Sequence, residues 1–120
     1  MILDKLKNCE LSGITFVQDY VQFSFYIFRE NGRTPCLSAY TWPRVKTEDG
    51  VFLSTQPGYR DALCSFIGKY VLSAYEVENE KIVVKFEEDM EIIISLKQED
   101  RVCAEAAMIQ VDGGQNWEVW

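Results

Sequence analysis

Residues 81–96, with the sequence KIVVKFEEDMEIIISL, contain the alternation that decides the fold class. In each half an apolar residue occupies every second position, which is the period of a half-buried β-strand. The acidic interruption at 87–89 is too short for a crossover, which needs about a dozen residues or more, so the two strands must pair antiparallel. The chain is therefore expected to be rich in antiparallel β-structure.

The same reading extends in both directions from this hairpin. A preceding strand and turn complete a β-meander over 71–96, and alternating apolar residues predict another meander over 14–41. Within the latter, Asn31-Gly32 accepts the positive φ angles of a tight hairpin turn. Residues 104–120 are expected to add C-terminal strands.

One helix is predicted between the meanders, over 57–67. Pro57 suits a first helical turn, and Gly68 suits a C-terminal stop. The apolar stripe that should lie on the sheet comprises Tyr59, Ala62, Leu63 and Phe66. The predicted fold is thus α+β, a single domain over 1–120 in which two antiparallel meanders, about six to eight strands, pack with one main helix.

The composition narrows the class of partner. The chain has 120 residues, with 19 acidic against 12 basic side chains and a net charge of −7. Such a surface repels phosphate, so neither nucleic acid nor an anionic membrane is an expected partner. The chain has no apolar run near the roughly 20 residues that span a bilayer, and its first residues do not resemble a signal peptide, so a cytoplasmic protein is expected.

The residues that usually carry catalysis are missing. The chain has no histidine, the commonest general base and metal ligand. Its four cysteines are widely spaced, without the close pairs of zinc or redox sites, and are expected to be structural thiols. No catalytic residue, cofactor or metal is therefore predicted, and binding is the function that remains. Paired carboxylates leave a small enzyme or ligand binder as an alternative.

Acidic residues are concentrated in one part of the chain. Residues 76–100 contain nine acids and three lysines, a net charge of −6. Their two turns should lie at opposite ends of the middle strand and form two acidic rims; the alternative is that turns are simply polar. With aromatic residues that commonly anchor interfaces, the predicted partner-binding residues are Glu78, Glu80, Glu87, Glu88, Asp89, Trp42, Tyr59 and Trp117.

Two further features have two interpretations each. Trp120, the last residue of the sequence, either docks into the core or is offered to a partner. A basic stretch interleaved with Tyr40 and Trp42 is either a solvated sheet edge or an RNA-binding surface, and the net charge favours the former. Its members are Arg29, Arg33, Arg44 and Lys46.

Several segments together resemble small bacterial proteins of uncharacterised families and immunity proteins of polymorphic or contact-dependent toxin systems. These segments are 11–13 and 66–68, which open strands, then 81–86, 91–96, 104–106 and 117–120. Ala104 departs from the pattern, in which proline usually precedes the glutamate. The resemblance implies a cytoplasmic antidote that binds one cognate toxin, often a nuclease.

The predicted function is therefore that of an immunity-type protein whose acidic surface meets a basic toxin domain. An acidic surface can be steered onto a basic nuclease at a high rate. The alternatives are a binding module or homodimer unrelated to toxins and, last, a small carboxylate-based enzyme or ligand binder.

Overall fold

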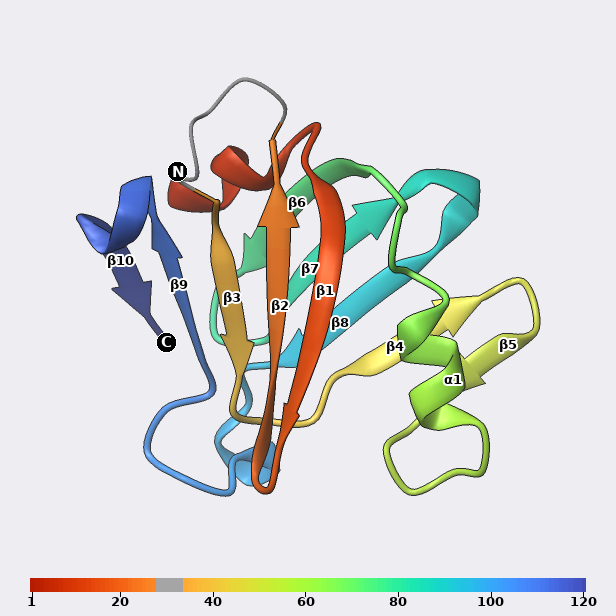
Figure 1. The fold of residues 1–120 in the computed structure, drawn as a ribbon. Coiled ribbons are helices and arrows are strands. Elements are labelled where there is room, and N and C mark those ends of the chain that lie inside the picture. Colours follow the sequence, from red (N-terminus) through yellow and green to blue (C-terminus); the bar gives the residue numbers. More distant parts are fainter. Residues whose placement is uncertain (28–33) are drawn as a thin grey trace.

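Two five-stranded antiparallel sheets make up the fold (Figure 1). The computed structural model describes residues 1–27 and 34–120, so the predicted turn at Asn31-Gly32 lies outside the described residues. Sheet A has the order β1-β2-β3-β9-β10, and sheet B has the order β5-β4-β8-β7-β6. The chain thus leaves sheet A after β3, builds sheet B, and returns to complete sheet A.

The strands have the following bounds. Sheet A comprises β1 (Glu10–Val17), β2 (Tyr20–Tyr26), β3 (Cys36–Ala39), β9 (Ala107–Val111) and β10 (Asn116–Val119). Sheet B comprises β4 (Arg44–Thr47), β5 (Gly50–Phe52), β6 (Val71–Val77), β7 (Lys81–Phe86) and β8 (Glu91–Ser95). The helical segments are α1 (Tyr59–Cys64) and the 3₁₀ turns η1 (Ile2–Leu6), η2 (Glu87–Asp89), η3 (Gln98–Asp100) and η4 (Asp112–Gly114).

The prediction of an α+β fold with one main helix is wrong, because the fold is a β-sandwich-like pair of sheets. A helix was expected over 57–67, but the α-helix found there, α1, has only six residues. Gly58 before it has a left-handed φ of 84°, and after it the backbone N–H of Ser65 bonds to the carbonyls of both Asp61 and Ala62, which tightens the chain into turns. No helix of the described segments is long and apolar enough to cross a bilayer.

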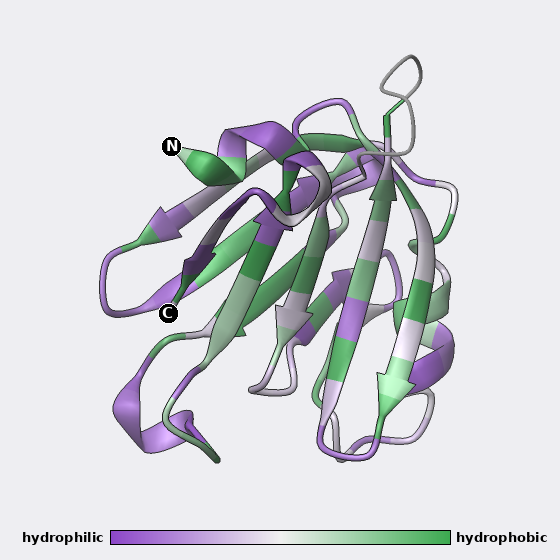
Figure 2. Cartoon of the chain, turned by 60° about the vertical axis from the view of Figure 1, so that its left-hand side comes forward, coloured by the Kyte–Doolittle hydropathy of each residue, from purple (hydrophilic) through white to green (hydrophobic). Residues whose placement is uncertain are grey.

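The core explains why a helical layer is not needed. Each sheet has one apolar face, and the two faces bury each other. Neither sheet therefore needs a layer of helices to cover its apolar side chains. Figure 2 shows hydrophobic residues along the strands and hydrophilic ones gathered in the turns and short helices. Sheet A contributes Phe23, Leu37 and Ile109, which are neighbours in register and fully buried. Sheet B contributes Ile82, Val84, Phe86, Ile92 and Ile94.

The stripe predicted on the helix is buried as expected, although it spans more than the helix. Tyr59, Ala62, Leu63 and Phe66 are all buried in the core. Phe66 lies beyond the end of α1 and meets Phe86 edge to face at 5.0 Å. The spacing of these four residues therefore predicted their burial correctly. It did not predict the length of the helix, because a short helix followed by tight turns can bury the same four side chains as a long helix.

The two sheets are joined at the predicted strand openers. The backbone N–H of Leu11 donates to the Lys69 carbonyl at 2.9 Å, and that of Gly68 donates to the Leu11 carbonyl at 2.8 Å. Two more bonds connect Asn8 and Cys9 to Val71, at 2.9 and 2.8 Å. The start of β1 is thereby paired with the start of β6. We call this backbone pairing of 8–11 with 68–71 the sheet junction.

Trp120 docks onto the protein rather than facing solvent freely. It packs against the core, and its Nε1–H donates to Oε1 of Glu76 on β6 at 3.0 Å. Its backbone N–H donates to the Ala107 carbonyl at 2.9 Å, which extends the pairing of β10 with β9. One residue therefore fastens the edge of sheet A to the edge of sheet B.

We expect W120F to lower the free energy of unfolding by about 1–3 kcal/mol, because it removes the donor to a half-buried carboxylate and reduces packing. Urea denaturation measures the change. The matched control is W117F, since Trp117 is 62% exposed and its replacement should cost less than about 0.5 kcal/mol. Equal losses in the two variants would contradict the docked role of Trp120.

Candidate functional site

The five predicted acids lie at the two ends of sheet B. Glu78 and Glu80 belong to the turn between β6 and β7, whereas Glu87, Glu88 and Asp89 form η2 between β7 and β8. A six-residue strand separates the two groups by about 20 Å. The five residues therefore belong to two different surfaces.

The turn between β4 and β5 adds two carboxylates to the η2 group. Lys46 is the register partner of Glu91, so the turn that follows β4 lies beside the turn that precedes β8. We call the combined group the acidic rim, and its members are Glu48, Asp49, Glu87, Glu88 and Asp89. Sequence reasoning missed Glu48 and Asp49, because no local pattern announces that β4 pairs with β8.

Lys69 lies beside the acidic rim and is paired with one of its carboxylates. Its Nζ is 2.9 Å from Oε1 of Glu88. This hydrogen bond, with the negative charges of Glu88, Glu87 and Glu48, raises the pKa of the Lys69 amine. The field at Lys69 therefore includes carboxylates from both turns.

Two carboxylates of the acidic rim form a hydrogen bond or ion pair with described residues, and three do not. Glu87 accepts a hydrogen bond from the backbone N–H of Tyr70 at 3.2 Å, and Glu88 pairs with Lys69. The side-chain oxygens of Glu48, Asp49 and Asp89 have no hydrogen bond or ion pair to any described residue. These three carboxylates are available to a partner.

The opposite end of sheet B carries mixed charge. The backbone N–H of Leu96 donates to the Glu80 carbonyl at 2.8 Å, which places η3 beside the β6–β7 turn. This brings Glu99 and Asp100 near Glu78 and Glu80, together with the basic side chains of Lys81, Lys97 and Arg101. The acidic character of the protein is therefore strongest at the acidic rim.

The three predicted aromatic anchors have different environments. Tyr59 is only 4% exposed and its hydroxyl donates to the Pro43 carbonyl at 2.5 Å, so it is a core residue. Burial raises the pKa of the Tyr59 hydroxyl well above its usual value. Trp42 meets Tyr59 edge to face at 6.4 Å and is half-buried. Trp117 is exposed on β10, in the other sheet.

The outer face of sheet B is basic, although the segment 76–100 is acidic overall. Residues that are cross-strand partners share a face, so Arg44, Ile93 and Val83 lie together on the side away from the core. The charged strand residues of that face are Arg44, Lys46, Lys81, Lys85 and Glu91. Lys46 pairs with Glu91 at 3.5 Å. On this face the strands carry bases apart from Glu91, whereas most acids of the segment occupy the turns.

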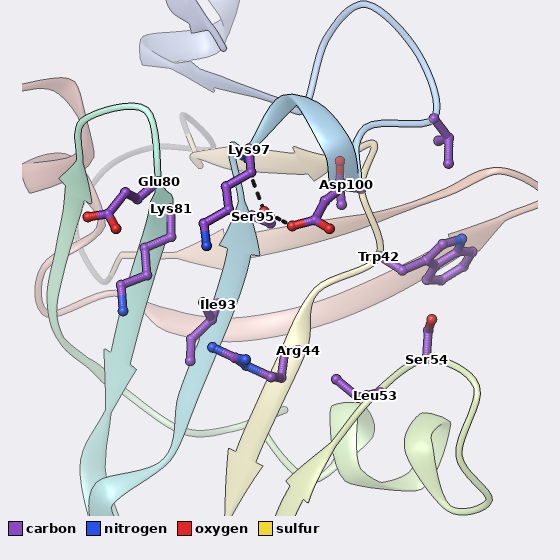
Figure 3. Close-up of a pocket in the computed structure, with 12 residues that line it drawn as sticks. Trp42, Arg44, Leu53, Ser54, Glu80, Lys81, Ile93, Ser95, Lys97 and Asp100 are labelled. Atoms are coloured by element: carbon purple, nitrogen blue, oxygen red, sulfur yellow. Dashed lines mark hydrogen bonds between the residues drawn. The ribbon is translucent and has the colours of Figure 1, made fainter.

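A pocket of about 520 Å³ lies on this outer face, toward the end of β8 that is remote from the acidic rim (Figure 3). It receives side chains from β4, β7 and β8, from the loop after β5, and from the η3 region. Its lining comprises Thr41, Trp42, Arg44, Leu53, Ser54, Glu80, Lys81, Ile93, Ser95, Lys97, Asp100 and Val102. The sequence prediction included Trp42 and Glu80 but not the pocket, because Lys81 and Lys97 are hidden in an acidic segment.

The predicted basic stretch is divided between different places. Arg44 lines the pocket, and Lys46 is engaged with Glu91. Arg29 and Arg33 lie outside the described residues. Among residues 1–27 and 34–120, no group of three His, Cys, Asp or Glu side chains is arranged to hold a metal ion.

Comparisons with known proteins add no assignment. No protein-family model matches the chain, and neither curated proteins nor solved structures give a match. The resemblance to immunity proteins therefore stays a prediction, and the site geometry is the basis for a functional proposal.

The raised pKa of Tyr59 predicts a pH-dependent contribution to stability. The unfolded chain ionises this phenol near pH 10.0 while the folded protein resists ionisation, so the contribution is complete below that pH and is lost as pH rises above it. At neutral pH, Y59F should lose about 0.5–1.5 kcal/mol with its hydrogen bond. Urea denaturation at successive pH values should show wild-type stability falling more steeply than that of Y59F in alkaline solution.

The control is Y26F, which changes a tyrosine that is 43% exposed. Its stability should follow the wild-type profile. Parallel profiles for wild type and Y59F would contradict the burial of a neutral phenol at this position.

Proposed function

We propose that the chain is an immunity-type protein that binds one cognate toxin domain through the acidic rim and neutralises it in a stoichiometric complex. The observation that carries the proposal is the gathering of five carboxylates from two neighbouring turns at one end of sheet B, where Glu48, Glu87 and Glu88 all act on Lys69. Three of these carboxylates have no partner among the described residues.

The electrostatics of the acidic rim favour a basic protein as the partner. Like charges held close together repel one another, and a positively charged surface relieves that repulsion. A nuclease domain presents cations because it grips phosphates. The unpaired carboxylates of Glu48, Asp49 and Asp89 offer negative charge to such cations and would compete with nucleic acid for them.

Apolar anchors lie next to the acidic rim. Tyr70 is 51% exposed, and its backbone N–H is the donor to Glu87. Leu72, two residues later, is 55% exposed at the β-bulge near the start of β6. Exposed apolar side chains beside charged groups are typical of interface hot spots with a polar surround. In this proposal Tyr70 and Leu72 replace the buried Tyr59 as anchors.

The first experiment is co-expression with the protein encoded next to this gene. We expect a neighbouring open reading frame for a large secreted protein with a toxin-like C-terminal domain, and we expect that domain to co-purify with the chain at 1:1 stoichiometry. An isolated gene, or a neighbour that does not co-purify, would favour a binding module unrelated to toxins.

The second experiment assigns the surface. The variant E48Q/D49N/D89N should slow association with that toxin domain by about tenfold or more at low salt and flatten the salt dependence of the rate. The matched control E78Q/E80Q/E99Q removes the same charge at the other end of sheet B and should change the rate by less than about threefold. Equal effects of the two variants would sink the assignment of the acidic rim.

A further inference from the structure

Three basic side chains of the pocket have no counter-ion among residues 1–27 and 34–120. Arg44, Lys81 and Lys97 all line the pocket, and none forms an ion pair with a described residue. Figure 3 shows their side chains around Ile93, with the carboxylate of Glu80 on the far side of Lys81 from Arg44. In a protein of net charge −7, unpaired cations gathered in one concave place are unexpected on composition alone.

The strand register explains why these cations share one site. Arg44 is the cross-strand partner of Ile93, and Lys81 is the partner of Ser95. Lys97 follows Ser95 by two residues and so continues on the same face. The two acids of the lining form no ion pair with them: Asp100 accepts a hydrogen bond from the Ser95 hydroxyl at 2.5 Å, and Glu80 lies at the margin.

Thr41 is a buried polar residue in the wall of the pocket. It lines the pocket and is 7% exposed, yet its Oγ1 has no hydrogen-bond partner in the described part of the chain. A buried hydroxyl without a partner costs free energy, and an apolar residue of the same shape would avoid that cost. The protein covers this oxygen, so the hydroxyl belongs to the wall of the pocket and not to its contact surface.

The other end of the pocket is apolar and includes an aromatic ring. Trp42, Leu53 and Val102 line it. The loop carrying Leu53 is held in place because the Leu53 N–H donates to Oε1 of Gln56 at 2.7 Å. A planar group could stack on the indole while an anionic group reaches the cations.

We infer that this pocket binds a small ligand that carries one phosphate group and a planar ring, the chemistry of a nucleoside monophosphate. The volume of about 520 Å³ is within the range of roughly 300–1,000 Å³ that such ligands occupy. Three cations against two acids suit a single phosphate better than a longer, more highly charged chain. The planar ring stacks on Trp42, and the phosphate lies among Arg44, Lys81 and Lys97.

This inference is independent of the proposed toxin binding. The pocket is near Ser95 and Lys97, whereas the acidic rim is beside Glu91 at the other end of β8. Loss of either function by mutation should therefore leave the other unchanged.

Calorimetric titration of the full chain tests the ligand class with defined probes: the four ribonucleoside monophosphates, adenosine and inorganic phosphate. At least one monophosphate should bind with a Kd below about 1 mM and at least tenfold tighter than adenosine or inorganic phosphate. Adenosine isolates the ring, and inorganic phosphate isolates the anion. No binding by any monophosphate, or equal binding of inorganic phosphate, would overturn the inference.

The variant K81Q/K97Q tests the cationic end, and we expect it to weaken the best monophosphate by about tenfold or more. The control K85Q removes a lysine from the same strand and the same face, but outside the pocket, and should change the affinity by less than about twofold. Both variants should keep the wild-type Tm within a few degrees, since all three lysines are at the surface. Unchanged affinity in K81Q/K97Q would contradict the site.

The variant T41V changes the wall of the pocket without changing its contact surface. It should raise the Tm of the unliganded protein by about 2–6 °C, because it removes an unpartnered buried oxygen. It should leave the affinity for the monophosphate within about twofold, because the oxygen is covered by the protein. A lower Tm or a tenfold loss of affinity would contradict this placement of the hydroxyl.

Discussion

The hydrogen bonds of the sheet junction, between residues 8–11 and 68–71, fix how the two sheets lie on each other. Each sheet has one apolar face that only the other sheet buries, and the junction sets where that burial begins. From this point β6 runs obliquely behind sheet A, and near its other end Glu76 receives the indole N–H of Trp120 (Figure 1). The junction also positions Lys69 and Tyr70 against η2, so the arrangement of the acidic rim follows from the joining of the sheets.

The strands themselves could be predicted from the sequence, but not their distribution between two sheets. Alternation revealed β2, β7 and β8, and short connections required antiparallel neighbours. The pairs β3–β9 and β4–β8 join segments that are far apart in the chain, and no local pattern reports such contacts. The helix was overestimated for a related reason, because the stripe from Tyr59 to Phe66 records which side chains are buried and not how long the helix is.

The candidate sites show the same division between local and non-local information. The acids at 87–89 were recognisable as a turn, but Glu48 and Asp49 join them only through the pairing of β4 with β8. Averaging charge along 76–100 hid Lys81 and Lys97, because a strand sends alternate side chains to opposite faces while its turns project from the ends. Tyr59 could have been removed from the predicted anchors beforehand, since the stripe to which it belongs was expected to be buried.

The separation of turns and strands on sheet B also gives the molecule a permanent electric dipole along β8. The negative end is the acidic rim, whereas at the other end the cations Arg44, Lys81 and Lys97 offset the nearby acids and make that end less negative. In dilute salt such a molecule orients in the field of a charged partner that approaches it, although two copies, each of net charge −7, repel each other. At an ionic strength of about 0.1 M the screening length is only about 10 Å, and the orientation is then decided at contact distance. Net charge therefore describes the solubility of this protein better than it describes which end a partner meets first.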